Sequence, residues 1–221
     1  MRVVIAGGHG KIALILEKLL SERGDSIAGL IRNPAQAADL AEAGAEAIVL
    51  DLETASVQEL AGHLTGADAV VFAAGAGPGS GADRKASVDR DAAVLLADAA
   101  EAAGVGRYLL LSAMGDHLRA APTTFDEGFG AYLRAKAGAE DAVRARSAFR
   151  ATIVRPGLLG NEPGTGRVDL GERTGTGPIP RADVAAVLLA LLDEPRLDGR
   201  TVEVIGGDTP IVDAVTALAA R

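Results

Sequence analysis

Three polar side chains in the middle of the chain, Ser112, Tyr132 and Lys136, are of types that together move a proton to or from a carbonyl oxygen. Tyr132 and Lys136 are four positions apart, so they share one face of a helix. A lysine ammonium beside a phenol lowers the phenol pKa, and the tyrosine can then act as acid or base. Ser112 ends an apolar run, where its hydroxyl could polarise a substrate carbonyl. The set suits hydride transfer at a carbonyl carbon, although this Tyr–Lys spacing also occurs on solvated helix faces.

A glycine-rich turn near the N-terminus separates a short apolar run, residues 3–6, from an amphipathic helical pattern. Glycine permits the angles of a tight turn and close approach of the backbone to a phosphate, and the free N–H groups of a helix start attract an anion. In this strand–turn–helix context the pattern predicts a site for the pyrophosphate of a dinucleotide. The residues assigned to it are Gly7, Gly8, His9, Gly10, Lys11 and Ile12. His9 either lines this loop or is an ordinary solvated histidine.

The residues after the second predicted strand discriminate between the two nicotinamide dinucleotides. An acidic residue at this point binds the ribose 2′-hydroxyl of NAD, whereas an arginine accommodates the 2′-phosphate of NADP. The chain has Arg32 and Asn33 there and no carboxylate. The guanidinium can fork onto a phosphate with Asn33 assisting, and the alternative is a surface arginine in a turn. We therefore predict NADP as the cofactor, with NAD possible.

Two further strand ends complete the predicted cofactor site. Asp51 and Leu52 follow the third strand, where Asp51 could accept a hydrogen bond from the adenine amino group while Leu52 packs on the ring. An aspartate that caps the next helix is the alternative, and the two roles are compatible. The fourth strand ends in small residues, which leave room for a ribose against the backbone: Ala73, Ala74 and Gly75.

Short apolar runs alternate with helical patterns along the chain, which predicts an α/β fold with a Rossmann-type doubly wound parallel sheet. We expect strands at residues 3–6, 27–31, 47–50, 69–73, 108–111, 152–154 and 202–205. Helices are expected at residues 11–22, 35–43, 57–64, 87–103, 131–145, 181–192 and 210–220. The glycine-rich loops 75–83 and 157–180 follow strand ends, where ligands bind in such sheets, so both are candidate walls of a substrate site. Arg84 and Lys85 are either ligands of an anionic substrate or pyrophosphate, or solvated loop charges.

Length, charge and composition narrow the class of protein. The 221 residues fit a single domain, with residues 155–180 as a substrate-side loop region. A net charge of −8 argues against nucleic acid as a partner, and the absence of cysteine excludes disulfides and thiolate metal sites. The three histidines are scattered, so we expect no metal site. With neither a signal-peptide pattern nor a membrane-spanning run, we expect a cytoplasmic monomer or small homo-oligomer with a small-molecule substrate and no membrane partner.

In combination these motifs resemble the short-chain dehydrogenase/reductase superfamily, in its atypical, NmrA-like branch of NAD(P)-binding proteins. The resemblance spans nearly the whole chain and includes residues 152–157 and 181–185. It implies a Rossmann-type domain with a short C-terminal substrate region and NAD(P)H bound along the carboxyl edge of the sheet. The chain departs from the pattern at Asp89, where extended members often have asparagine.

The resemblance also implies roles for individual residues. Tyr132 would be the acid/base, Lys136 would hold the nicotinamide ribose and lower the tyrosine pKa, and Ser112 would orient the substrate. Pro156 would belong to the turn beside the nicotinamide. The expected function is NADPH-dependent reduction of a small carbonyl, quinone or flavin-like substrate. The alternatives are a non-catalytic NADP(H)-sensing regulator and a sugar-nucleotide epimerase or dehydratase, for which the region after Pro156 is short.

Overall fold

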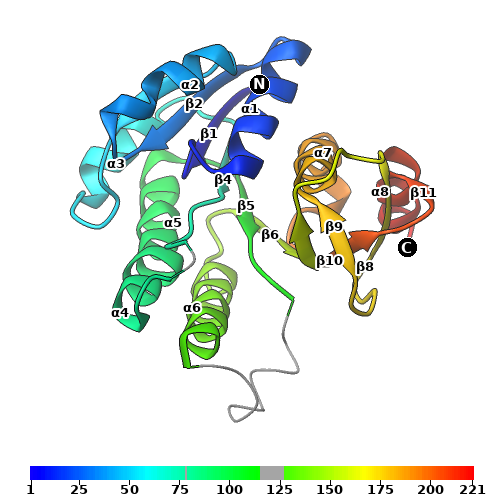
Figure 1. Ribbon diagram of the computed structural model, residues 1–221. Helices are drawn as coiled ribbons and strands as arrows, with labels where there is room; N and C mark the ends of the chain where they lie inside the picture. Colours follow the sequence, from blue (N-terminus) through cyan, green and yellow to red (C-terminus); the bar gives the residue numbers. More distant parts are fainter. Residues whose placement is uncertain (78, 115–126) are drawn as a thin grey trace.

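A computed structural model describes residues 1–77, 79–114 and 127–221 of the chain, in which strands and helices alternate (Figure 1). The strands of the main sheet are β1 (Arg2–Ala6), β2 (Ser26–Ile31), β3 (Glu46–Val49), β4 (Ala69–Phe72), β5 (Arg107–Leu111), β6 (Arg150–Pro156), β8 (Arg167–Gly171), β10 (Thr201–Gly206) and β11 (Thr209–Pro210). Two short strands, β7 (Leu158–Gly160) and β9 (Pro178–Pro180), form a separate parallel pair.

The main sheet has the order β11-β8-β10-β6-β5-β4-β1-β2-β3 among the described residues. Strands β1 to β6 and β10 run parallel; Val3 of β1, for example, is in register with Ile27 on one side and Ala69 on the other. The segment 3-2-1-4-5-6 is the strand order of a Rossmann fold, so the predicted fold class is confirmed. The order reverses between β1 and β4, and ligands of such sheets bind at the carboxyl ends of the strands at this point.

Helices cover both faces of the sheet (Figure 1). They are α1 (Lys11–Arg23), α2 (Ala37–Glu42), α3 (Val57–Leu64), α4 (Ala82–Lys85), α5 (Ala92–Ala103), α6 (Glu127–Arg144), α7 (Arg181–Leu192) and α8 (Ile211–Ala219), with the 3₁₀ turns η1 (Pro34–Gln36) and η4 (Pro195–Leu197) and the π-helical turn η2 (Ala86–Asp91). Alternate residues of β1 enter opposite cores: Val3 packs with residues of α1 and α7, and Val4 with residues of α3 and α5. No helix in the described part of the chain combines the length and apolarity needed to cross a bilayer.

Expectations for two regions differ from the structure. The region 157–180, predicted as a loop, contains β7, β8 and β9, and β8 pairs antiparallel with β10. β8 has five residues, the last of them a glycine, and a glycine precedes it; so short a segment carries too little periodicity to be predicted as a strand. The helix expected at 87–103 begins earlier, because α4, η2 and α5 follow one another without a break from Ala82. Most of the connection between residues 114 and 130, including His117, lies outside the described residues.

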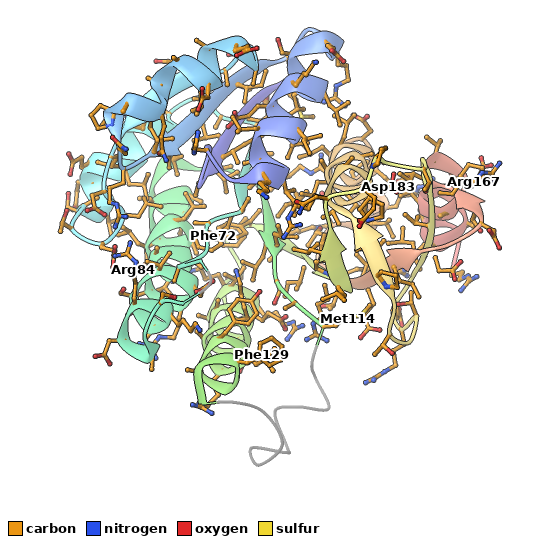
Figure 2. All side chains as sticks on the ribbon, in the orientation of Figure 1. Phe72, Arg84, Met114, Phe129, Arg167 and Asp183 are labelled. Carbon is orange, nitrogen blue, oxygen red and sulfur yellow. The ribbon has the colours of Figure 1, made fainter. Side chains whose placement is uncertain are left out.

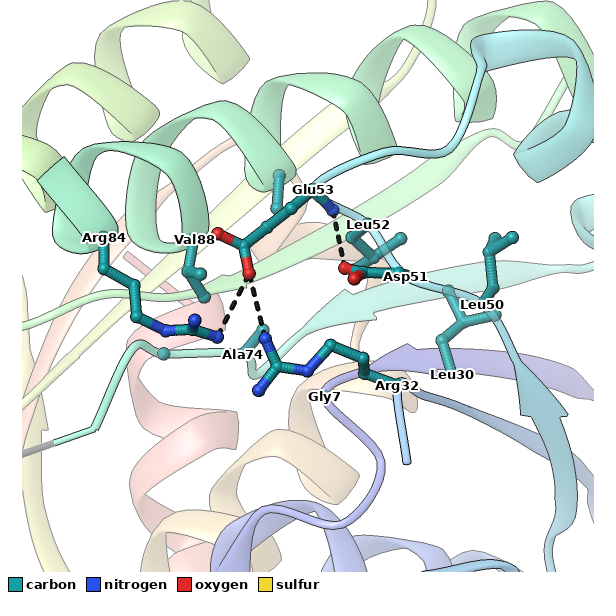
Figure 3. A pocket seen from close by; sticks show the side chains of 12 residues that line it. Gly7, Leu30, Arg32, Leu50, Asp51, Leu52, Glu53, Ala74, Arg84 and Val88 are labelled. Atoms are coloured by element: carbon teal, nitrogen blue, oxygen red, sulfur yellow. Dashed lines mark hydrogen bonds and ion pairs between the residues drawn. The ribbon is translucent and has the colours of Figure 1, made fainter. Parts of the chain in front are cut away.

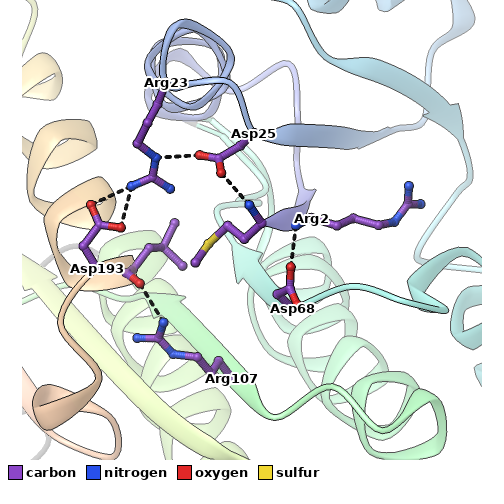
Figure 4. Close-up of polar contacts among 8 residues, drawn as sticks. Arg2, Arg23, Asp25, Asp68, Arg107 and Asp193 are labelled. Atoms are coloured by element: carbon purple, nitrogen blue, oxygen red, sulfur yellow. Dashed lines mark hydrogen bonds and ion pairs between the residues drawn. The ribbon is translucent and has the colours of Figure 1, made fainter.

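Ion pairs gather at the amino ends of the parallel strands, opposite to the expected ligand edge (Figure 4). Arg23 at the end of α1 contacts both carboxylate oxygens of Asp193 at 2.6 Å, just beyond α7. The N-terminal amine donates to Asp25 at 2.7 Å, and Arg107 at the start of β5 contacts Asp198 at 2.7 Å. These contacts join helices and strands that are far apart in the sequence. They all lie at the edge of the sheet opposite to the one where a ligand is expected.

Beneath the glycine-rich turn, α1 buries a carboxylate. Glu17 is fully buried, and neither of its carboxylate oxygens has a hydrogen-bond partner among the residues that the structure describes. A Cβ atom on Gly29 would lie 2.6 Å from its Oε1, and one on Gly8 would lie 3.0 Å away. Burial raises the pKa of Glu17 to about 8, because the charged form cannot be solvated there.

This burial predicts how stability depends on pH. The folded protein keeps the Glu17 proton to a higher pH than the unfolded chain, so the free energy of unfolding falls as pH rises from about 4.5 to about 8. Glu17→Gln removes the ionisation, and we expect its stability relative to the parent protein to improve by roughly 2–5 kcal/mol between about pH 5 and about pH 8.5. Urea unfolding at both pH values measures the change, with Glu22→Gln at an exposed position of α1 as the matched control. Equal differences at the two pH values would contradict a buried, protonated Glu17.

Candidate functional site

The turns after β1 and β4 touch at the point where the strand order reverses. Gly7 has φ +81°, and a Cβ atom at this position would lie 2.6 Å from the Cα atom of Ala74. The backbone N–H of Gly8 donates to the Leu30 carbonyl oxygen at 3.0 Å, which holds the same turn against the end of β2. Only glycine satisfies both the angle and the contact at position 7.

The amino end of α1 opens at this turn. Gly10 is the N-cap residue in an extended conformation, and within the described chain no side chain caps it and no acidic residue lies in the first turn. The first N–H groups of the helix are therefore available to an anion, and the helix dipole favours negative charge there. Lys11 and Ile12, the first helical residues, line the larger of two cavities at this edge. A glycine turn and an open helix start fit a pyrophosphate group.

Two polar residues of the turn are held by other parts of the protein. His9 Nε2 lies 2.6 Å from Asp39 Oδ2, so its side chain links the turn to α2. Lys11 Nζ donates to Asn161 Oδ1 at 3.3 Å, and the same oxygen accepts from Arg181 at 2.9 Å. The described linings of the two cavities include Lys11 but neither His9 nor Gly8. The predicted contact of His9 with a cofactor stays a prediction.

A smaller cavity of about 150 Å³ lies at the carboxyl ends of β1 to β4 (Figure 3). Arg32 Nη1 points to Glu53 Oε2 at 3.0 Å at the edge of this cavity. The lining comprises Gly7, Leu30, Arg32, Leu50, Asp51, Leu52, Glu53, Ala74, Gly75, Arg84, Val88 and Ala92. Six of these belong to the predicted cofactor site. The sequence analysis did not assign Glu53 a role and did not place Arg84 at this end.

The remaining polar residues near the smaller cavity stabilise local turns. Asn33 Oδ1 accepts a hydrogen bond from Ala35 N at 3.1 Å and caps η1. Asp51 Oδ1 accepts from Glu53 N at 3.0 Å, so it caps its own turn, while Ser56 caps α3. The structure thus gives Asp51 a capping role in a turn rather than at the following helix, and its position on the lining remains compatible with a contact to adenine.

The larger cavity, of about 840 Å³, runs from the start of α1 to α6. It brings together all three predicted catalytic residues, Ser112, Tyr132 and Lys136, with Gly10 and Ala73 of the predicted cofactor site. Ala74 and Gly75 line both cavities, which are therefore neighbours. Pro156 ends β6, and its carbonyl oxygen accepts from Met114 N at 3.3 Å; it lies outside the described lining of both cavities.

Lys136 is buried at the bottom of this arrangement. Its Nζ lies 3.4 Å from Asp89 Oδ1, and it donates to the carbonyl oxygens of Leu111 at 3.2 Å and Ala74 at 3.3 Å. Asp89 is also buried, on the π-helical turn η2, and its second oxygen accepts from Ala76 N at 3.2 Å. An ammonium has three protons, and two of them are donated to carbonyl oxygens, so a ribose hydroxyl on Lys136 would compete with Asp89 for the third.

Tyr132 and Lys136 share one face of α6, as their spacing predicts, with Lys136 Nζ 5.9 Å from the centre of the Tyr132 ring. The predicted direction of the pKa shift is wrong for this structure. Burial first, and the negative charge of Asp89 second, raise the pKa of Tyr132 to about 12. Asp89 offsets the charge of Lys136, and a neutralised pair cannot stabilise a phenolate. Phe129, on the first turn of α6, stacks on Tyr132 with ring centres 6.0 Å apart (Figure 2).

Ser112 lies at the end of β5, as predicted, but its hydroxyl proton is engaged by a carboxylate. It donates to Glu140 Oε1 at 2.6 Å, and the same carboxylate accepts from Arg155 Nε at 2.9 Å. Ser112, Glu140 and Arg155 are all buried. The sequence analysis missed Glu140, although Tyr132, Lys136 and Glu140 recur at intervals of four residues on the same helix face. Because the Ser112 hydroxyl donates its only proton to Glu140, it has none left to donate to a substrate carbonyl in this arrangement. Its predicted role in polarising that carbonyl stays a prediction.

Comparisons with known proteins agree with this geometry. A family model described as NAD(P)H-binding matches residues 7–195. The chain is 38% identical over 219 residues to the uncharacterized sugar epimerase YhfK of Bacillus subtilis, covering 99% of this chain and 100% of that protein. Two solved structures share the fold along almost their whole length. A Bacillus halodurans protein, proposed to be an NAD-dependent epimerase/dehydratase, has a TM-score of 0.89 and 37% identity, covering 99% of this chain and 100% of that one.

The second solved structure is the oxidoreductase ylbE of Lactococcus lactis, with a TM-score of 0.81, 26% identity and coverage of 100% of this chain and 98% of that one. The family match includes the glycine turn, the strand ends that line the two cavities and the Tyr132–Lys136 pair. It agrees with the resemblance to atypical short-chain dehydrogenases/reductases. The chain therefore belongs to the NAD(P)H-binding family of Rossmann-type proteins.

Proposed function

We propose that the protein is an NADPH-dependent reductase of a small carbonyl, quinone or flavin-like molecule. One observation carries this proposal: a single cavity joins the open amino end of α1 to Tyr132 and Lys136. The smaller cavity would hold the adenosine end of the cofactor and the start of α1 its pyrophosphate. The part of the larger cavity beside Tyr132 would hold the nicotinamide and the substrate. This order follows the carboxyl edge of the sheet from β2 to β5.

The residues of the larger cavity suit the proton half of a reduction. Bound NADPH would supply a hydride to the carbonyl carbon, and the carbonyl oxygen must then gain a proton. Tyr132 donates that proton, because its raised pKa keeps the hydroxyl protonated at neutral pH. Lys136 and Asp89 form a buried ion pair beside the tyrosine, with Lys136 Nζ 5.9 Å from the centre of its ring. Leu111 and Phe129 contribute apolar surface to the wall of this part of the cavity.

A sugar-nucleotide epimerase or dehydratase is the second candidate, because the name of one relative contains the words sugar epimerase and that of another the words epimerase/dehydratase. The match covers the full length of both relatives, so neither of them has a substrate domain in addition to the part that matches this chain. In this chain most residues after Pro156 build β8, β10, β11, α7 and α8, which extend the sheet and cover it. Little chain remains for a nucleotide-sugar layer, which favours a smaller substrate.

A panel of carbonyls, quinones and flavins tests the proposal through NADPH oxidation. We expect turnover with at least one class, and Tyr132→Phe should lower it by roughly 10²–10⁴-fold with little change in cofactor affinity, because only the proton donor is lost. Tyr108→Phe, the same chemical change at a buried tyrosine outside the described linings of both cavities, is the control. Interconversion of UDP-sugars without net NADPH consumption would favour the epimerase. Tight NADPH binding with no turnover on the panel would favour a sensor.

The pKa of Tyr132 itself can be tested without a substrate. Asp89→Asn removes the second cause of the raised pKa, so we expect the Tyr132 titration to move to lower pH by roughly one unit. The chain has two tyrosines, and Tyr108 is fully buried with its hydroxyl on the Ala93 carbonyl oxygen, so NMR of the tyrosine ring carbons resolves the titration. Asp91→Asn, at an exposed position of the same helical turn, is the control. An unchanged midpoint in Asp89→Asn would show that burial alone sets the pKa.

The choice of cofactor depends on Arg32. Arg32→Ala should weaken NADPH binding by about 1.5–3 kcal/mol, the usual contribution of a hydrogen bond to a charged group, and leave NADH binding nearly unchanged. Fluorescence titration with both nucleotides measures the two affinities. Equal losses for NADPH and NADH would show that Arg32 does not contact the 2′-phosphate.

A further inference from the structure

A second arginine meets Arg32 at the smaller cavity. Arg84, on α4, places its Nη2 atom 3.0 Å from Glu53 Oε2, the same oxygen that lies 3.0 Å from Arg32 Nη1 (Figure 3). Arg32 directly follows β2, Glu53 lies in the turn after β3 and Arg84 lies on α4, so three separate segments of the chain meet at one point. All three residues belong to the lining of the cavity.

The lining of the smaller cavity carries two arginines and two carboxylates, but both arginines pair with the same carboxylate. Two guanidinium groups share one carboxylate oxygen, and the other oxygen of Glu53 accepts from Ser87 Oγ at 2.7 Å. The second carboxylate of the lining, Asp51, is engaged with the backbone of Glu53. The side chains of Arg32 and Arg84 are 54% and 41% exposed, so water screens these ion pairs and an incoming anion can exchange with them at little cost.

A phosphate dianion matches such a site better than a carboxylate does. It offers three acceptor oxygens and about two negative charges, and guanidinium groups bind it in a bidentate fork. A single arginine at the end of β2 leaves part of that charge unpaired. A second guanidinium approaching from α4 would pair it.

We propose that Arg84 is a second ligand of the cofactor's 2′-phosphate, and that Glu53 is the internal counter-ion that the phosphate displaces. The inference rests on the proposed use of NADPH and extends it to a residue outside the β2 turn. In the displaced arrangement the guanidinium groups of Arg32 and Arg84 and the hydroxyl of Ser87 turn from Glu53 to phosphate oxygens. Cofactor selection then depends on three segments of the chain.

Adenosine 2′,5′-bisphosphate and AMP test this end of the cofactor alone, because they differ only in the 2′-phosphate. Calorimetric titration should show that Arg84→Ala lowers the affinity for the bisphosphate by about tenfold or more and leaves the affinity for AMP nearly unchanged. Arg84→Lys should recover part of the loss, because it restores the charge without the fork. Glu53→Gln should raise the affinity for the bisphosphate several-fold, because it removes a negative charge that competes with the phosphate for the two arginines. Arg90→Ala, an exposed arginine on the following turn paired with Asp91, is the control for charge and folding.

The outcomes separate this inference from the proposed function. If Arg32→Ala weakens the bisphosphate but Arg84→Ala does not, Arg84 is not a ligand and the NADPH proposal survives. If the unmodified protein binds AMP as tightly as the bisphosphate, the preference for NADP itself fails. Equal losses of AMP and bisphosphate in Arg84→Ala would mean that Arg84 only supports the cavity wall, and weaker bisphosphate binding by Glu53→Gln would overturn the displacement.

Discussion

The contact between the turns after β1 and β4 is the constraint on which the rest of the site depends. The Gly7 backbone lies so close to Ala74 that a Cβ atom would be 2.6 Å from the Ala74 Cα atom, and the positive φ of Gly7 directs the chain into α1. This contact places the amino end of α1 over the edge of the sheet, between the two cavities. A larger or differently angled residue would separate the turns and move the helix start away from both.

Buried charge distinguishes the substrate end of this edge from the cofactor end. Lys136 pairs with Asp89, and Glu140 pairs with Arg155, all of them buried between α6, η2 and the central strands. Removing such pairs from water costs free energy that an apolar core would not, so they are poor devices for stability. Their consequence here is chemical: the Tyr132 hydroxyl keeps its proton, and the Ser112 hydroxyl is oriented by Glu140.

The two edges of the sheet have different roles: ion pairs between distant segments lie at the amino edge, and the cavities lie at the carboxyl edge. At the amino edge, Arg23 and Arg107 tie α1 and β5 to the end of α7 and the segment beyond it (Figure 4). At the carboxyl edge, Lys11, Lys85 and Arg181 line the larger cavity of a chain whose net charge is −8. Cations concentrated in a cleft of an acidic protein attract an anionic dinucleotide there rather than elsewhere on the surface.

Local patterns in the sequence predict the fold class, the glycine turn and the shared helix face of Tyr132 and Lys136. These features depend on local periodicity and backbone freedom, which neighbouring residues specify. The sequence did not reveal β8, whose short alternation between glycines is too weak a signal. Only the tertiary structure decided that Arg84 meets Arg32 at Glu53 and that Asp89 neutralises Lys136 and raises the pKa of Tyr132. Both outcomes depend on distances between segments far apart in the chain and on burial, and the spacing of residues in a sequence specifies neither.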